Sequence, residues 1–131
     1  MAADSARSES PQALDALASR YVDVGALPWV DTPDPGIKMK VLMHDAATDR
    51  LTVLVKLAPG ARIPEHTHED LEQMLVLEGS LVDHEGACTA GNFVLRPAGS
   101  RHSPYAPDGC LMLVFFLKGT IRLQHSMYDK R

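Results

Sequence analysis

The decisive stretch is Gly60-Ala-Arg-Ile-Pro-Glu-His66-Thr-His68-Glu-Asp-Leu-Glu72-Gln-Met-Leu-Val-Leu-Glu-Gly79, which has the pattern G-x5-H-x-H-x3-E-x6-G. His66 and His68 are two residues apart, so both side chains leave the same face of a β-strand. On an α-helix the two imidazoles would point about 200° apart and could not share one metal ion. Glu72 opens the strand that returns after a polar bend. The spacing therefore predicts a β-hairpin that gathers two imidazoles and a carboxylate.

A second stretch supplies the remaining candidate ligand. It is Gly91-Asn-Phe-Val-Leu-Arg-Pro97-Ala-Gly99-Ser-Arg-His102, with the pattern G-x5-P-x-G-x2-H. Because the two stretches are far apart in sequence, a shared site requires two hairpins to meet, as they do in a small closed barrel. Three imidazoles and one carboxylate suit a mononuclear transition-metal site. We predict the metal ligands His66, His68, Glu72 and His102.

Both motifs resemble those of the cupin superfamily, and they occur in the same order. The first motif matches at every position, whereas the second matches through His102 but has Ala106 where many cupins carry an asparagine. That asparagine usually supports the site and is not a ligand. The wider sequence, including Val-Leu-Glu-Gly79 and Asp-Gly-Cys110, resembles the ChrR-like cupin subgroup. The resemblance covers roughly residues 25 to 118.

Short apolar segments separated by glycine and proline turns predict an all-β fold. They lie at residues 37–43, 51–57, 92–96 and 111–117. Together with the motif hairpins they indicate a double-stranded β-helix, the jelly-roll barrel of cupins. Upstream, Ser10 as N-cap and Pro11 at the first helical position predict one short helix, with Leu14 and Leu17 on its apolar side. We expect an N-terminal arm with this helix over residues 1–24 and a single cupin domain over residues 25–131.

Composition excludes several classes of partner. A net charge of −4 and a pI near 5.8 provide no basic surface, so nucleic acid is not an expected partner. The longest apolar run, residues 110–117, is too short to span a bilayer, so no membrane association is expected. Charged residues in the first ten positions interrupt any secretory signal. Cys88 and Cys110 form no C-x-x-C pair, and we expect two free thiols in a cytoplasmic protein.

Five residues near the ligands are candidates for contact with a small-molecule substrate. Arg62 and Arg101 flank the histidines and could hold a substrate anion through paired hydrogen bonds. Tyr105 could serve as a hydrogen-bond donor or an acid. Met74 and Phe115 could line an apolar cavity. Each candidate has an ordinary alternative, because arginines are common on surface loops and methionine and phenylalanine are common in a barrel core.

The donor set also limits the metal. Imidazole and carboxylate ligands suit Fe(II), Mn(II), Ni(II), Cu(II) or Zn(II) and are too rich in nitrogen for Mg(II) or Ca(II). Four protein ligands leave open positions on a five- or six-coordinate ion, whereas tetrahedral zinc would be saturated. We therefore favour Fe(II) as the cofactor, with Zn(II), Mn(II) and Ni(II) as alternatives.

The resemblance implies an oxidoreductase in the first instance. ChrR-like cupins include enzymes that cleave diketones and hydroxyaryl ketones, which predicts a non-heme metal-dependent dioxygenase that cleaves a carbon–carbon bond in such a substrate. Glu72 is a departure, because some of those relatives use three histidines alone. The resemblance also implies a homodimer.

Two other functions remain open. The namesake of the subgroup is an anti-sigma factor, so the alternative is a non-enzymatic metal- or small-molecule-sensing module. Its cupin part accompanies a zinc-binding, sigma-binding domain, whereas residues 1–25 of this chain hold no histidine or cysteine. Metal-assisted isomerisation of a sugar-like substrate is a third function of this fold. It would need a proton-moving residue, for which Tyr105 and Glu72 are the candidates.

Overall fold

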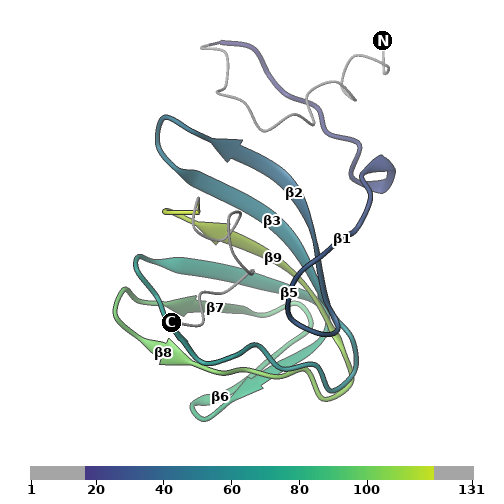
Figure 1. Ribbon diagram of the computed structural model, residues 1–131, viewed down its shortest axis with the longest axis vertical. Coiled ribbons are helices and arrows are strands. Elements are labelled where there is room, and N and C mark those ends of the chain that lie inside the picture. The colour runs from purple at the N-terminus through teal and green to yellow at the C-terminus, as the bar shows by residue number, and fades with distance from the viewer. Residues whose placement is uncertain (1–16, 120–131) are drawn as a thin grey trace.

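Antiparallel strands make up nearly all of the regular structure in residues 17–119, the part of the chain that the computed structural model describes (Figure 1). In chain order the elements are the 3-10 helix η2 (Val24–Ala26) and the strands β1 (Val30–Asp31), β2 (Ile37–Asp45), β3 (Arg50–Leu57), β4 (His66–Thr67), β5 (Glu72–Asp83), β6 (Gly86–Thr89), β7 (Phe93–Arg96), β8 (Arg101–His102) and β9 (Cys110–Phe116). The expected all-β fold is confirmed.

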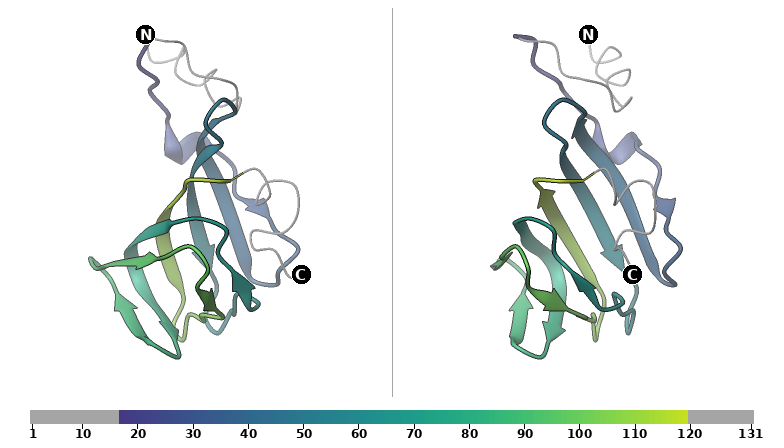
Figure 2. Two further views of the ribbon diagram at one scale, coloured as in Figure 1. Left: turned by 90° about the vertical axis from the view of Figure 1, so that its left-hand side faces the viewer. Right: turned by 60° about the vertical axis from the view of Figure 1, so that its left-hand side comes forward.

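The strands form one large curved sheet and a small two-stranded sheet. The large sheet has the order β1-β2-β3-β9-β5-β6, with β7 also paired to β5, and the small sheet pairs β4 with β8. In Figures 1 and 2 the large sheet curves so that β2 and β3 lie at one end of the molecule and β6 and β8 at the other. Strands that are distant in sequence therefore surround one interior.

Strand β5 connects the two ends of this arrangement. Its first half pairs with β7 and β9, and its second half pairs with β6. The register to β9 shifts between Val76 and Glu78, so one extra residue, Leu77, forms a β-bulge. Just beyond it, Gly79 has φ +73°, and a Cβ at this position would overlap the backbone oxygen of Gly109. The bend in β5 therefore depends on a residue without a side chain.

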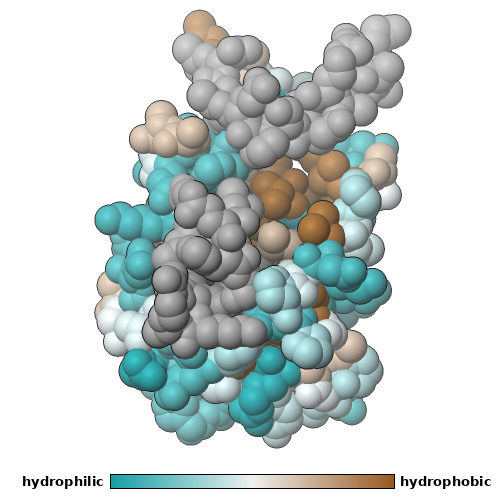
Figure 3. Space-filling model, viewed as in Figure 1, coloured by the Kyte–Doolittle hydropathy of each residue, from teal (hydrophilic) through white to brown (hydrophobic). Residues whose placement is uncertain are grey.

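Alternation along the strands separates a buried face from an outer face. On β3, on β5 up to Val76 and on β9 every second residue is buried, which gives the core residues Leu51, Val53, Val55, Leu57, Met74, Val76, Met112, Val114 and Phe116. Burial of this apolar face is the main favourable contribution to folding. In Figure 3 hydrophobic residues gather around β1 and β2, whereas the end around β6 and β8 is mostly hydrophilic.

The segment before β2 is tied to the outer face of the sheet. The Lys40 amine donates to the Val24 carbonyl at 2.8 Å and lies 4.8 Å from the ring centroid of Trp29. These contacts explain why a lysine in the middle of β2 is buried. The predicted N-terminal helix falls almost wholly on residues outside the described range, and Leu17, its last apolar residue, is not helical. No helix in the described residues is long and apolar enough to cross a membrane.

Gly79→Ala should destabilise the fold by more than about 1 kcal/mol, because an L side chain there is strained and overlaps Gly109. Gly91→Ala is the matched control, since Gly91 has φ +85° but open space around its Cβ position. Urea unfolding followed by circular dichroism compares the two variants with wild type. Equal losses of stability in both would show that backbone strain alone, and not the close approach to Gly109, requires the glycine at position 79.

Candidate metal centre

The pairing of β4 with β8 sets two of the predicted ligands opposite each other. His66 is the register partner of His102, and Thr67 is the partner of Arg101. Both histidines are buried, whereas Thr67 and Arg101 are exposed. Because side chains alternate along a strand, this register directs both imidazoles to the interior and both of their neighbours to solvent.

His68 and Glu72 complete the group. The His68 ring centroid lies 4.6 Å from that of His66 and 5.5 Å from that of His102, and His68 Nδ1 is 3.3 Å from Glu72 Oε1. All four residues are no more than 3% exposed. His68 is fixed by its backbone, since its N–H donates to the Ser100 carbonyl at 2.9 Å. The structure thus brings His66, His68 and Glu72 into one group and places His102 beside it in the interior.

The donor atoms fit a transition-metal ion. Ligand atoms of His66, His68 and Glu72 lie within 4.8 Å of one another, a spacing that small movements would close around one ion. His66 Nδ1 is 2.9 Å from the Pro64 carbonyl, which can only accept, so Nδ1 carries the proton and Nε2 keeps its lone pair. His102 Nε2 is buried and has no hydrogen-bond partner. A bound cation would satisfy this nitrogen, whose isolation otherwise costs free energy.

A second group of possible ligands surrounds the other side of His102. Asp83, His84 and His102 also offer ligand atoms within 4.8 Å of one another. The Arg96 guanidinium, however, has Nη1 2.6 Å from Asp83 Oδ2 and 3.2 Å from His102 Nδ1. A positive charge already occupies this position, so the arrangement disfavours a second cation there. We therefore assign Asp83 and Arg96 to the support of His102.

Sequence analysis missed both Asp83 and Arg96. Arg96 lies inside the second motif, immediately before its proline, but nothing in the motif assigns it a partner. Asp83 ends β5, and its Oδ1 accepts the backbone N–H groups of Glu85 and Gly86 at 2.9 and 3.2 Å. The only feature in the sequence was an aspartate before a Gly-containing turn, which is common without any functional role.

The electrostatics keep His102 neutral and Asp83 charged. Burial, together with the nearby Arg96 charge, lowers the pKa of His102, although Asp83 and Glu85 oppose the shift. Burial alone would raise the pKa of Asp83, but the Glu85 backbone N–H and the Arg96 guanidinium outweigh it and hold this pKa below its ordinary value. A neutral imidazole has a free lone pair, which metal binding requires.

The predicted substrate contacts have different locations. Met74 is buried on the same face of β5 as Glu72, two residues further along. Phe115 lies on the outer face of β9, and Phe116 is the residue that faces the interior, directly opposite Glu72 in the register. The structure therefore brings Met74 to the ligand group and places Phe115 away from it.

The two arginines and the tyrosine lie outside the ligand group. Arg62 is exposed, donates to the Ser103 carbonyl at 2.7 Å and stacks on the ring of Tyr105 at 4.7 Å. Arg101 points to solvent, donates to Thr67 Oγ1 and pairs with an exposed glutamate. The contacts of these three side chains are with neighbouring residues of the loops and strands, and a role in substrate binding stays a prediction.

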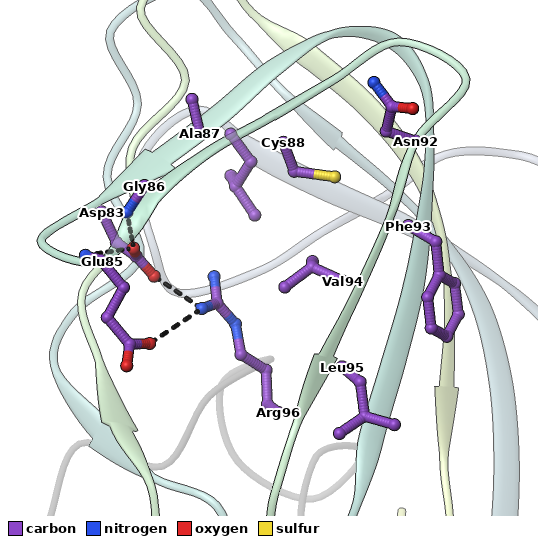
Figure 4. Close-up of a pocket in the computed structure, with 11 residues that line it drawn as sticks. Asp83, Glu85, Gly86, Ala87, Cys88, Asn92, Phe93, Val94, Leu95 and Arg96 are labelled. Atoms are coloured by element: carbon purple, nitrogen blue, oxygen red, sulfur yellow. Dashed lines mark hydrogen bonds and ion pairs between the residues drawn. The ribbon is translucent and has the colours of Figure 1, made fainter.

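A cavity of about 290 Å³ opens between β6 and β7, and Asp83 and Arg96 form part of its lining (Figure 4). Figure 4 shows Cys88 and Val94 directed into it, while Phe93 points away. The Arg96 guanidinium forms part of its wall and turns toward Asp83. The cavity therefore borders Asp83 and Arg96, the two residues whose side chains lie beside His102 Nδ1.

Both cysteines are buried and free, as expected from their spacing. Burial raises the pKa of the Cys88 thiol, and burial with the neighbouring Cys88 raises the pKa of Cys110 to about 11. Metal ligation requires the thiolate. Neither thiol is therefore suited to replace a histidine in the metal group.

Comparison with known structures identifies the fold. A putative acetylacetone dioxygenase from Methylibium petroleiphilum PM1 is 18% identical, with a TM-score of 0.73 over 79% of this chain and 80% of that chain. An acetylacetone dioxygenase from Acinetobacter johnsonii is also 18% identical, with a TM-score of 0.71 over 79% and 76%. A chain in the complex of Rhodobacter sphaeroides SigE with the anti-sigma ChrR is 25% identical, with a TM-score of 0.62 over 70% and 50%.

These similarities define the chain as a cupin. A family model described as the ChrR cupin-like domain matches residues 17–120, and the chain belongs to that family. No match was found among curated proteins. At 18% identity the two dioxygenases show the fold alone. The family and the predicted superfamily are confirmed, and the activity is a separate question.

His66→Ala and His68→Ala should each lower the affinity for Zn(II) by more than about tenfold, because each removes one of four ligands. Chelator competition on the purified chain measures this affinity. His84→Ala is the matched control, since His84 is exposed and belongs only to the second group. Loss of binding in His84→Ala with retention in His66→Ala would move the metal site to the Asp83 side of His102.

Proposed function

We propose that this chain is a metal-dependent dioxygenase that cleaves a carbon–carbon bond in a small diketone- or hydroxyketone-like substrate. The observation that carries the proposal is the buried group of three imidazoles and one carboxylate. The acetylacetone dioxygenases with this fold give the proposal its reaction class. Both atoms of dioxygen end in the two carbonyl-containing fragments, so the reaction needs no external reductant.

The chain contributes the ligands and the apolar surroundings. His66, His68, Glu72 and His102 would hold the metal, and Met74 and Phe116 lie on the same interior face. Fe(II), the ion that we favour, would act as a Lewis acid and, if six-coordinate, would have two positions left for the oxygens of a chelating substrate; Zn(II), Mn(II) and Ni(II) remain alternatives. The apolar side chains exclude water, which strengthens electrostatic interactions inside the site.

A non-enzymatic sensing or binding module is the second candidate. It is favoured by the 25% identity to a chain in the SigE–ChrR complex, which exceeds the identity to either dioxygenase. In that role the same four ligands would bind a metal, and binding or exchange of the metal would be the sensed event. The two candidates differ in one measurable property, the consumption of dioxygen.

The Fe(II)-loaded protein, reconstituted without oxygen, should take up dioxygen when it is mixed with one member of a panel of small diketones and hydroxyketones. Uptake should disappear in His68→Ala, which lacks a ligand, and persist in His44→Ala, which removes a histidine of β2 that belongs to neither group. An oxygen electrode and analysis of the cleaved products follow the reaction. Stoichiometric metal binding with no uptake across the panel would favour the sensing module.

We also propose that the chain forms a homodimer through the outer face of the large sheet. This face carries exposed Leu77, Phe93, Leu95 and Phe115, each 38–53% exposed. Register pairing places half-buried leucines beside them on the same face, namely Leu54, Leu75, Leu111 and Leu113. None of these eight side chains is charged. At ~150–250 Å² for a whole large side chain, their exposed parts amount to roughly 400–500 Å².

That area matches what a dimer needs. One side of a standard interface buries about 800 Å², of which about 60% is apolar. A two-fold axis would set the eight apolar side chains of one copy against those of the other, with exposed Lys56 and Glu78, the register partners of Leu111, on the same face. Among the described strands, β7 pairs only with β5, so the edge next to Phe93 is also available for contact.

Phe93→Glu should convert the dimer to a monomer, because it would bury a charge within an apolar contact. Sedimentation velocity at about 100 µM would measure the change. Val30→Glu is the matched control, since Val30 is exposed to a similar degree on β1 but lies outside the face. A monomeric wild type, or a dimer that survives Phe93→Glu, would remove this surface as the interface.

A further inference from the structure

The Nδ1 side of His102 faces three charged groups. Asp83 Oδ2 lies 3.2 Å from Nδ1, Glu85 Oε1 lies 3.4 Å away, and Arg96 Nη1 lies 3.2 Å away. The carboxylates can only accept a proton from the ring, and the guanidinium can only donate one to it. Which of them is the partner of Nδ1 decides which nitrogen of His102 carries the proton.

The two carboxylates differ in how firmly they are held. The Asp83 side chain is 4% exposed and the Glu85 side chain 62% exposed. Asp83 Oδ1 accepts two backbone N–H groups of the β5–β6 turn, so the carboxylate is held in place with its Oδ2 3.2 Å from His102 Nδ1. An exposed glutamate is screened by water and loses side-chain entropy when it is held in place. Asp83 is therefore the stronger partner of His102.

Arg96 competes for the same nitrogen but has a better partner. Its Nη1 is 2.6 Å from Asp83 Oδ2 and 3.2 Å from His102 Nδ1. A charge-assisted contact of guanidinium with carboxylate is stronger than one with a neutral imidazole. Arg96 Nη1 carries two N–H groups, and the shorter distance assigns one of them to Asp83 Oδ2. This contact also stabilises a carboxylate that would otherwise be buried without a counter-charge.

We propose that Asp83 is a positioning residue for the metal centre, and that Arg96 holds Asp83 in place. Asp83 accepts the Nδ1 proton of His102, which leaves the buried Nε2 with its lone pair for a metal ion. The proposal rests on the metal site described above. His66 follows the same logic, because the Pro64 carbonyl accepts its Nδ1 proton. Two of the imidazoles are then preset for metal binding by acceptors outside the ligand group.

The wild-type protein without metal gives the first test. Long-range ¹⁵N–¹H NMR spectra distinguish the two neutral tautomers of a histidine ring directly. His102 should carry its proton on Nδ1 at pH 7.5. A proton on Nε2 would overturn the proposal, and this measurement needs no variant and no metal.

Asp83→Asn and Glu85→Gln form a matched pair of substitutions, because each replaces one carboxylate near His102 with its neutral amide. In Asp83→Asn the amide oxygen should keep the two backbone N–H groups, so its NH2 group faces the ring and donates to Nδ1. His102 should then change to the Nε2–H tautomer, and the affinity for Zn(II) should fall about 10–100-fold. Glu85→Gln should change neither property.

Chelator competition with Zn(II) measures the affinities of both variants and of wild type. Equal losses in both variants would overturn the proposal, because they would reflect only the removal of negative charge near a cation. So would unchanged affinity and tautomer in Asp83→Asn. If wild type bound no Zn(II), the metal site would fail, and the metal-free tautomers would still decide whether Asp83 positions His102.

Discussion

The site depends on one short piece of antiparallel pairing, that of β4 with β8. The two strands have two residues each, yet their register places His66 opposite His102 and turns both rings to the interior. Backbone hydrogen bonds between His68 and the segment at Gly99 and Ser100 extend the contact. A shift of one residue would send both imidazoles to solvent, because the side-chain period of a strand is two.

Two groups of side chains build the candidate metal centre, and they have different roles. On one side His66, His68 and Glu72 present their donor atoms to each other within a few ångströms. On the other side buried Asp83 and Arg96 neutralise each other and surround His102. Opposite charges therefore balance outside the ligand group, and Glu72 is the acidic residue inside it. This division explains how one interior contains both a carboxylate for metal binding and a closed ion pair.

The ligands could be predicted from sequence because local spacing decides them. Two histidines two residues apart share a strand face whatever the rest of the fold is. The support of His102 could not be predicted, since Asp83 and Arg96 meet only through the pairing of β5 with β6 and β7. Phe115 illustrates the same limit: adjacent phenylalanines occupy opposite faces, and only the register against β5 shows which one faces inward.

The bulge at Leu77 has a consequence for the whole length of β5. Before it, even-numbered residues such as Glu72 face the interior; after it, odd-numbered residues such as Leu81 and Asp83 do. Eleven positions separate Glu72 from Asp83, an odd number that would put them on opposite faces of a regular strand. The single extra residue at the bulge therefore lets both Glu72 and Asp83 face the interior. Two carboxylates with unrelated tasks thus share one strand, and a relative that lost the bulge could keep only one of them inside.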